Sequence, residues 1–182
     1  MILVGVGANM SGEGGAAPQE NCERALALME ADGVAIVARS GWYRSPPWPR
    51  SDQPEYINGV ARIEADGSPE ALLRRLHAIE AQMGRVRGAQ NIARVIDLDL
   101  LAVGRLVRSA RSTGNPTQLQ LPHPRLQDRA FVLFPLSEVA PMWTHPVSGR
   151  SVEEMIADLA DDQECGPIED PLDKIPKSLS FS

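Results

Sequence analysis

The sequence predicts an α+β fold in which helices pack on one face of an antiparallel sheet. Strand-like runs with alternating or β-branched residues occur at residues 1–7, 33–45, 56–65 and 94–103. Two segments with helical spacing of apolar residues separate them, at about residues 19–31 and 69–83. The resulting order, β-α-β-β-α-β, is that of a ferredoxin-like sandwich, and 182 residues are enough for one such domain.

The connections in the N-terminal half are rich in turn-forming residues. A glycine-rich loop follows the apolar first strand and leads into the first helix, and the stretch 46–54, with several prolines, is expected to be a loop between the second and third strands. The apolar positions of the first helix recur at helical spacing, and they are Cys22, Ala25, Leu28 and Met29.

The second helix has the clearest boundaries. Ser68 can cap its start, Pro69 suits its first turn, and Gly84 can end it. A shorter helix is expected over about residues 125–139. A last helix is expected to begin after Ser148 or, as its capping box with Glu154 favours, after Ser151.

The net charge of −6 is unevenly distributed along the chain. Residues 1–150 hold all 16 arginines and 15 acidic residues, whereas residues 151–182 hold nine acidic residues and two lysines. We therefore expect one domain over residues 1–160, followed by an acidic C-terminal tail over residues 161–182. The arginine fork suits carboxylates and phosphates, although genomic base composition would equally explain a preference for arginine over lysine.

Composition argues against a membrane or secreted protein. No run of apolar residues reaches the roughly 18–20 that a membrane helix needs, and the N-terminus lacks the basic region of a signal peptide. Cys22 and Cys165 have no metal-type or CxxC spacing. We expect a cytoplasmic protein with reduced cysteines.

Two aspartates interrupt the apolar strand "RVIDLDLLAVG", residues 94–104. Asp97 and Asp99 are two residues apart, so they project from the same face of the strand. Burying two unpaired carboxylates is costly, and a hard cation such as Mg²⁺ would offset that cost while leaving coordination sites for phosphate. The alternative is a solvated face on which both carboxylates point to water.

Three arginines lie in the loop that leads into this strand, namely Arg85, Arg87 and Arg94. Phosphoryl transfer depends mainly on positioning and on cations that stabilise charge, so such a loop could hold a polyphosphate. A basic loop that forms salt bridges with the same aspartates is the alternative. The GVGANM stretch lacks the last glycine of a dinucleotide fingerprint, there is no Walker motif, and few aromatic residues are available for an RNA-stacking surface.

In combination, several segments resemble the 6-hydroxymethyl-7,8-dihydropterin pyrophosphokinase (HPPK) family of folate biosynthesis. They are GVGAN (5–9), YRSPPW (43–48), DQPEYINGV (52–60), IEAQMGRVR (79–87), RVIDLDLL (94–101) and LPHPRLQDRAFVLFPLSEVAP (121–141). The resemblance covers about residues 2–160 in the order of the family. It implies transfer of pyrophosphate from ATP to the pterin hydroxymethyl group, with two Mg²⁺ ions and release of AMP.

The resemblance also implies roles for individual residues. The metal ligands would be Asp97 and Asp99, with Arg85 and Arg94 as catalytic arginines. The residues implied to bind ATP are Arg85, Arg87, Arg94, His123 and Arg129. The residues implied to bind the pterin are Ser45, Pro46, Trp48, Tyr56, Asn58 and Phe131, of which Tyr56 and Phe131 would sandwich the ring and Asn58 would read its edge.

Two departures from the family pattern and two alternative functions complete the interpretation. The loop at 88–93 is one residue shorter and lacks a tryptophan, and Gln120 stands where threonine is common. A different Mg²⁺-dependent nucleotidyl or phosphoryl transferase is one alternative, and a non-enzymatic RNA-binding or regulatory domain is the other. We expect a monomer that acts on small molecules, with no nucleic-acid or membrane partner.

Overall fold

The computed structural model describes residues 1–48, 50–85, 93–109 and 119–169. It confirms the predicted α+β class and its element order. The strands are β1 (Ile2–Ala8), β2 (Ala35–Arg39), β3 (Tyr43–Ser45), β4 (Tyr56–Glu64), β5 (Asp97–Val103) and β6 (Gly166–Pro167). The helices are α1 (Pro18–Ala31), α2 (Pro69–Gln82), α3 (Ala130–Val139) and α4 (Val152–Ala157), with short 3₁₀ turns η1 (Glu13–Gly15) and η2 (Leu126–Asp128).

The sheet is antiparallel, in the order β5-β1-β4-β3-β6, with β2 also paired to β4. The predicted second strand, residues 33–45, is divided into β2 and β3 at Ser40–Trp42. At this break the Ser40 hydroxyl accepts a hydrogen bond from the backbone N–H of Val60 at 3.0 Å. Trp42 lies directly over Gly59, where a Cβ atom would come within 2.7 Å of the indole.

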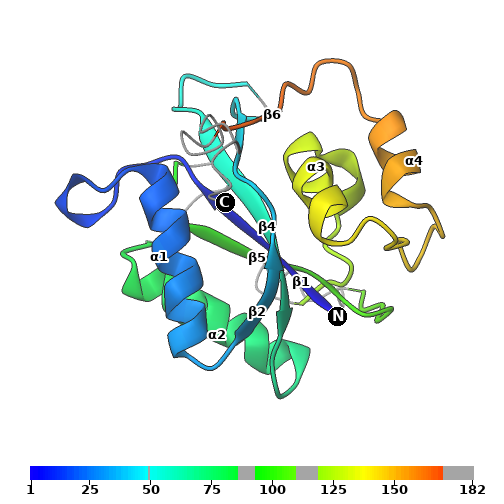
Figure 1. Cartoon of the computed structure of the whole chain (residues 1–182), viewed down its shortest axis with the longest axis horizontal. Coiled ribbons are helices and arrows are strands. Elements are labelled where there is room, and N and C mark those ends of the chain that lie inside the picture. Colours follow the sequence, from blue (N-terminus) through cyan, green and yellow to red (C-terminus); the bar gives the residue numbers. More distant parts are fainter. Residues whose placement is uncertain (49, 86–92, 110–118, 170–182) are drawn as a thin grey trace, which may run out of the picture.

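Helices cover both faces of the sheet, whereas the sequence had led us to expect them on one. α1 and α2 pack on one face and α3 and α4 on the other (Figure 1). Alternation along β1 explains the two cores, because Val4 and Val6 face α1 and α2 while Leu3 faces α3 and α4. The sheet therefore has a hydrophobic core on each of its two faces.

Hydrogen bonds confirm the predicted boundaries of α2 and the predicted start of α4. The helix expected from about residue 125 is shorter, because α3 begins at Ala130, after the 3₁₀ turn η2. The Ser68 hydroxyl accepts from the N–H of Ala71 at 3.2 Å, and Gly84 has the positive φ of 85° that suits a residue after a helix. The capping box of α4 joins Ser151 and Glu154 in both directions, at 3.1 and 2.7 Å.

The chain after residue 160 continues onto the sheet. The strand β6 pairs with β3, and the N–H of Ile168 donates to the carbonyl of Trp42 at 2.7 Å. Residues 161–169 thus lie against the domain beside the loop that follows β3. Within the described part of the chain, no helix has the length and apolar character needed to cross a bilayer.

Candidate functional site

Asp97 and Asp99 occupy the α3 side of β5, as the alternation of the strand predicts. Leu98 and Leu100 point the other way and are buried in the core beneath α1 and α2. β5 begins at Asp97, three residues later than expected, so Arg94 lies in the connection just before the strand. The core residues hold the strand from behind while the two carboxylates remain on the opposite face.

Two of the predicted arginines converge on one of these aspartates. Arg85 lies 2.5 Å from Oδ1 of Asp97, and Arg94 pairs with Oδ2 of the same carboxylate. The alternative in which the arginines form salt bridges with the aspartates is thus observed for Asp97. No described side chain forms an ion pair with Asp99. Arg87 lies outside the described residues.

Glu80 is a site residue that the sequence analysis did not identify. The residue is only 1% exposed, its carboxylate forms an ion pair with Arg85, and it accepts a hydrogen bond from the backbone N–H of Leu98 at 2.8 Å. The sequence held one signal, because Glu80 follows Leu76 by four residues and so falls on the buried stripe of α2. A buried acid at such a position requires a partner, and here the partner is a predicted catalytic arginine.

The environment of Asp99 disfavours its charged form. Burial raises the pKa of the Asp99 carboxyl to about 7, the negative charge of Asp97 adds to this effect, and Arg129 and Arg94 oppose it. A divalent cation beside the pair would favour the charged form instead. Further positive charge beside the two carboxylates would therefore stabilise the charged form of Asp99.

His123 and Arg129 lie close to the charged groups around Asp97 and Asp99. The backbone N–H of His123 donates to the carbonyl of Leu101 at 2.8 Å, which fixes the histidine next to β5. Burial, together with the charges of Arg129 and Arg125, lowers the pKa of His123 to about 4. His123 is thus a neutral imidazole at physiological pH, able to donate or accept one hydrogen bond.

A row of residues crosses the sheet from the predicted pterin side to the predicted metal side. Asn58 on β4 is opposite Gly7 on β1, and Gly7 is opposite Asp97 on β5. Neighbouring strands lie about 4.8 Å apart, so Asn58 and Asp97 are roughly 10 Å apart across the sheet. Glycine in the middle leaves room for the Asn58 amide, because a Cβ at Gly7 would lie 3.0 Å from Oδ1 of Asn58.

Asn58 is also joined to the last residue of β3. Its buried amide Nδ2 donates to the Ser45 hydroxyl at 3.0 Å. Tyr56 lies two residues earlier on the same face of β4 and donates to Oε1 of Gln53 at 3.3 Å. Burial raises the pKa of the Tyr56 hydroxyl, and the charges of Arg94 and Asp97 act on it in opposite directions. Tyr56 is therefore close to both halves of the site.

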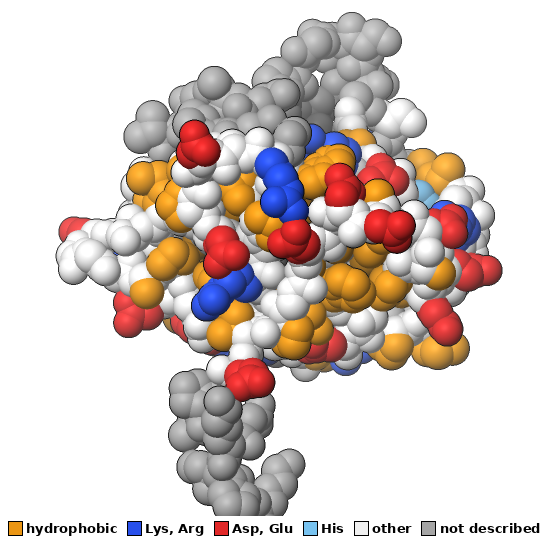
Figure 2. All heavy atoms as spheres, turned by 90° about the horizontal axis from the view of Figure 1, so that it is seen from above, with side chains coloured by type: hydrophobic (Ala, Val, Ile, Leu, Met, Phe, Trp, Pro, Cys, Tyr) orange, Lys and Arg blue, Asp and Glu red, His pale blue; other side chains and the backbone are white. Residues whose placement is uncertain are grey.

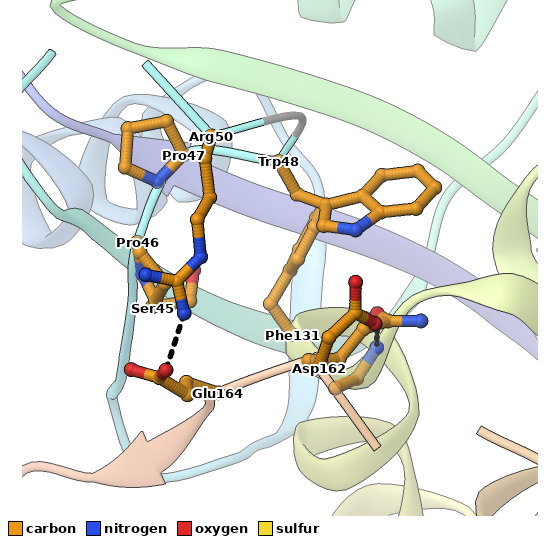
Figure 3. A pocket seen from close by; sticks show the side chains of 10 residues that line it. Ser45, Pro46, Pro47, Trp48, Arg50, Phe131, Asp162 and Glu164 are labelled. Carbon is orange, nitrogen blue, oxygen red and sulfur yellow. Dashed lines mark hydrogen bonds and ion pairs between the residues drawn. The ribbon is translucent and has the colours of Figure 1, made fainter. Parts of the chain in front are cut away.

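A shallow hollow lies between the loop after β3, the start of α3 and the C-terminal segment. Four of the predicted pterin-binding residues line it, namely Ser45, Pro46, Trp48 and Phe131. Trp48, Phe131 and Asp162 lie near one another in Figure 3. Tyr56 and Asn58 are not among the lining residues, and the only ring contact of Phe131 among the described residues is the Arg129 guanidinium, 5.2 Å from its centroid.

Asn9 connects the two halves, although the sequence analysis assigned it no role. It is 1% exposed, and its Nδ2 donates at 3.2 Å to both the Gln53 side chain and the Pro54 carbonyl. Its Oδ1 accepts the N–H of Arg94. No local pattern marks such a residue, because its partners lie 44 to 85 positions away.

Comparison with known proteins identifies the family that the sequence motifs resemble. Residues 3–141 match a family model described as 7,8-dihydro-6-hydroxymethylpterin-pyrophosphokinase (HPPK). The chain is 38% identical over 160 residues to a 2-amino-4-hydroxy-6-hydroxymethyldihydropteridine pyrophosphokinase of Synechocystis, an alignment covering 85% of this chain and 73% of the relative. A Pseudomonas aeruginosa protein of the same name is 36% identical over 157 residues, covering 86% and 90%.

The fold is also similar to a solved structure. A chain described as HPPK-DHPS in complex with substrates superposes with a TM-score of 0.58 at 14% sequence identity. The similarity covers 86% of this chain but only 42% of the solved one, so this chain corresponds to less than half of that protein. The likeness supports the observed fold.

Proposed function

This chain belongs to the 7,8-dihydro-6-hydroxymethylpterin-pyrophosphokinase family of folate biosynthesis, and we propose that it transfers pyrophosphate from ATP to the pterin hydroxymethyl oxygen with two Mg²⁺ ions. The products are AMP and the pterin diphosphate. One observation carries the proposal. The Asp97–Asp99 pair, with its arginines, lies on the same sheet face as Asn58, and Asp97 lies in the same cross-strand row as Asn58.

The donor set suits a metal that is only partly held by protein. The described residues contain no group of three or more acids, histidines or cysteines arranged to hold a metal ion. Mg²⁺ commonly takes one or two carboxylates and completes its shell with water and substrate phosphate, which fits Asp97 and Asp99. When bound, such ions neutralise the charge that develops on the transferred phosphoryl group.

The cationic residues act on the phosphates of ATP in this proposal. Arg94 and Arg85 are held at Asp97, so both guanidinium groups stand next to the carboxylate pair before substrate binds. Arg129 adds a third cation, and neutral His123 can contribute a hydrogen bond. Arg87 is proposed as a further phosphate contact on the basis of its place in the family motif.

The pterin binds beside these groups, between the loop after β3 and α3. Tyr56 and Phe131 supply aromatic faces for a flat heterocycle, and Asn58 supplies an amide with both donor and acceptor capacity. Ser45, Pro46 and Trp48 form the adjoining wall, where Ser45 already holds the Asn58 amide. Binding aligns the pterin hydroxyl with ATP, so its oxygen attacks the β-phosphorus while the bond to the AMP oxygen breaks.

The two alternative functions find less support. An unrelated phosphoryl transferase would not need the aromatic and amide residues that adjoin the phosphate side. An RNA-binding domain would need a basic surface, but on the face in Figure 2 the described arginines are interspersed with acidic side chains. Several are paired, including Arg39 with Glu23 and Arg150 with Asp158. We propose a monomeric cytoplasmic enzyme, consistent with two free cysteines.

The test is an incubation of the purified protein with ATP, Mg²⁺ and 6-hydroxymethyl-7,8-dihydropterin, with nucleotides separated by chromatography. AMP and the pterin diphosphate should form together in equal amounts, and only when pterin is present. Formation of ADP instead, or AMP that appears without pterin, would contradict the proposal. EDTA should stop the reaction, and added Mg²⁺ should restore it.

A further inference from the structure

Gln163, in the segment after α4, holds the backbone on both sides of Arg129. Its Oε1 accepts the N–H of Ala130 at 2.9 Å, and its Nε2 donates to the carbonyl of Asp128 at 2.8 Å. The N–H of Ala130 is one of the groups at the start of α3 that the helix itself leaves unpaired. A single side-chain amide thus connects the residue before Arg129 with the residue after it.

The side chain of Arg129 is attracted by the charges of Asp99 and Asp97, but it forms no ion pair with a described residue. Its Nε is buried and has no hydrogen-bond partner among the described residues, and its guanidinium lies over the ring of Phe131. The orientation of Arg129 and Phe131 therefore depends on the backbone from which they project. Arg129 is a proposed ATP-binding residue, and Phe131, two positions later, is a proposed pterin-binding residue.

The segment that carries Gln163 is anchored at both sides of the hollow. Glu164 forms an ion pair with Arg50, visible as the dashed line in Figure 3, and the segment then enters the sheet as β6 beside β3. Asp162, Gln163 and Glu164 all line the hollow described above. This segment follows the matched range of residues 3–141, so the family motifs do not include it.

We propose that Gln163 is a positioning residue for the transfer reaction, which orients Arg129 and Phe131 by fixing the peptide groups on either side of Arg129. The inference rests on the proposed function. Displacing reacting groups by about 1 Å can lower a rate by about 100-fold, so loss of both hydrogen bonds is expected to lower kcat/KM by about 10- to 100-fold. A residue that only capped α3 would affect stability and leave the kinetic constants unchanged.

The test compares Gln163→Met with Gln127→Met, the same change on the neighbouring turn. Among the described residues, the Gln127 amide donates a hydrogen bond only to the Asp128 carboxylate, at 3.5 Å, so its loss should leave the kinetic constants near those of the wild type. Gln163→Met should lower kcat/KM for both substrates at a temperature where circular dichroism shows each variant fully folded. Gln163→Glu keeps an acceptor for Ala130 but loses the donor to Asp128, so it also tests the second hydrogen bond if the Met variant is unstable.

The outcomes separate the two proposals. The positioning role is supported if the wild type forms AMP, the Gln163 variants have a lower kcat/KM, and the Gln127 variant has the kcat/KM of the wild type. The positioning role is overturned if the wild type forms AMP and the folded Gln163 variants have the same kinetic constants. The proposed function would then still stand. Absence of AMP formation by the wild type overturns the proposed function and, with it, this inference.

Discussion

Asn9 and Arg94 are joined by a reciprocal pair of hydrogen bonds. The N–H of Arg94 donates to Oδ1 of Asn9 at 2.7 Å, and the N–H of Asn9 donates to the carbonyl of Arg94 at 3.0 Å. Asn9 is the first residue after β1, and Arg94 lies shortly before β5. The backbone of Arg94, one of the two arginines at Asp97, is thus held by the residue that follows the adjacent strand β1.

Replacement of Asn9 by alanine should impair catalysis more than folding. Arg94 would lose its backbone acceptor, and the loop at Gln53–Pro54 would lose both hydrogen bonds from Nδ2. We expect a fall in kcat of about 10- to 100-fold, as for a misplaced charge-stabilising group. Steady-state assays of AMP formation measure it. Asn21→Ala is the control, since in the described part of the chain this buried amide donates only to the Met10 carbonyl. An equal loss of activity in both variants would refute a specific role for Asn9.

Asp99→Asn should abolish turnover while stabilising the metal-free protein. The change removes one metal ligand, so kcat should fall by about 1000-fold or more, but it also removes a buried charge that Asp97 repels. In EDTA at pH 8 the variant should have a higher Tm than the wild type. Mg²⁺ should raise the Tm of the wild type and not that of Asp99→Asn. Asp66→Asn, at an exposed position, serves as control. If Mg²⁺ raised the Tm of Asp99→Asn as much as that of the wild type, Asp99 would not be a metal ligand.

Arg94→Ala should lower kcat by about 100- to 1000-fold, the effect of losing one charge-stabilising donor. The Asp97 carboxylate would retain Arg85, so the fold should persist. Initial rates over a range of ATP concentrations separate kcat from KM. A change confined to the KM for ATP would show that Arg94 serves binding alone.

Gly7→Ala should weaken pterin binding through Asn58. A Cβ at Gly7 would lie 3.0 Å from Oδ1 of Asn58, which is too close unless the amide moves. Because Asn58 is also tied to Ser45, we expect the displaced amide to raise the KM for pterin by about 10-fold and the KM for ATP much less. Gly5→Ala is the matched control on β1, where the nearest atom is a Leu101 methyl at 3.4 Å. Equal effects of the two variants on the pterin KM would count against the role of Asn58.

Local rules predicted the part of the site that lies within one element. The two-residue period of a strand placed Asp97 and Asp99 together and buried Leu98 behind them. The boundaries were less accurate where a side chain replaces a backbone partner, as Ser40 does at the division between β2 and β3. No period or propensity indicates such a substitution.

The supporting residues were missed because their roles depend on contacts between distant segments. Glu80 reaches the N–H of Leu98, 18 residues later, and Gln163 reaches Asp128, 35 residues earlier. Each looks ordinary within its own segment. Their roles appear only when the packing of α2 on β5, and of the C-terminal segment on α3, is known.

Cys22 should make the stability of the protein decrease above about pH 9. Its side chain is 0% exposed beneath the sheet, and burial raises the pKa of the thiol to about 12, from 9.0 when unfolded. Below pH 9 both states hold the proton; above it only the unfolded chain releases it, so stability is lost as pH rises towards 12. Urea unfolding at pH 7.5 and 10.5 measures the free energy of unfolding of the wild type and of Cys22→Ala. The difference between the two proteins removes the contribution of all other titrating groups. The stability advantage of the wild type should shrink by about 2 kcal/mol, at about 1.4 kcal/mol per pH unit; a difference independent of pH would show that the thiol ionises in the folded protein as readily as in the unfolded chain.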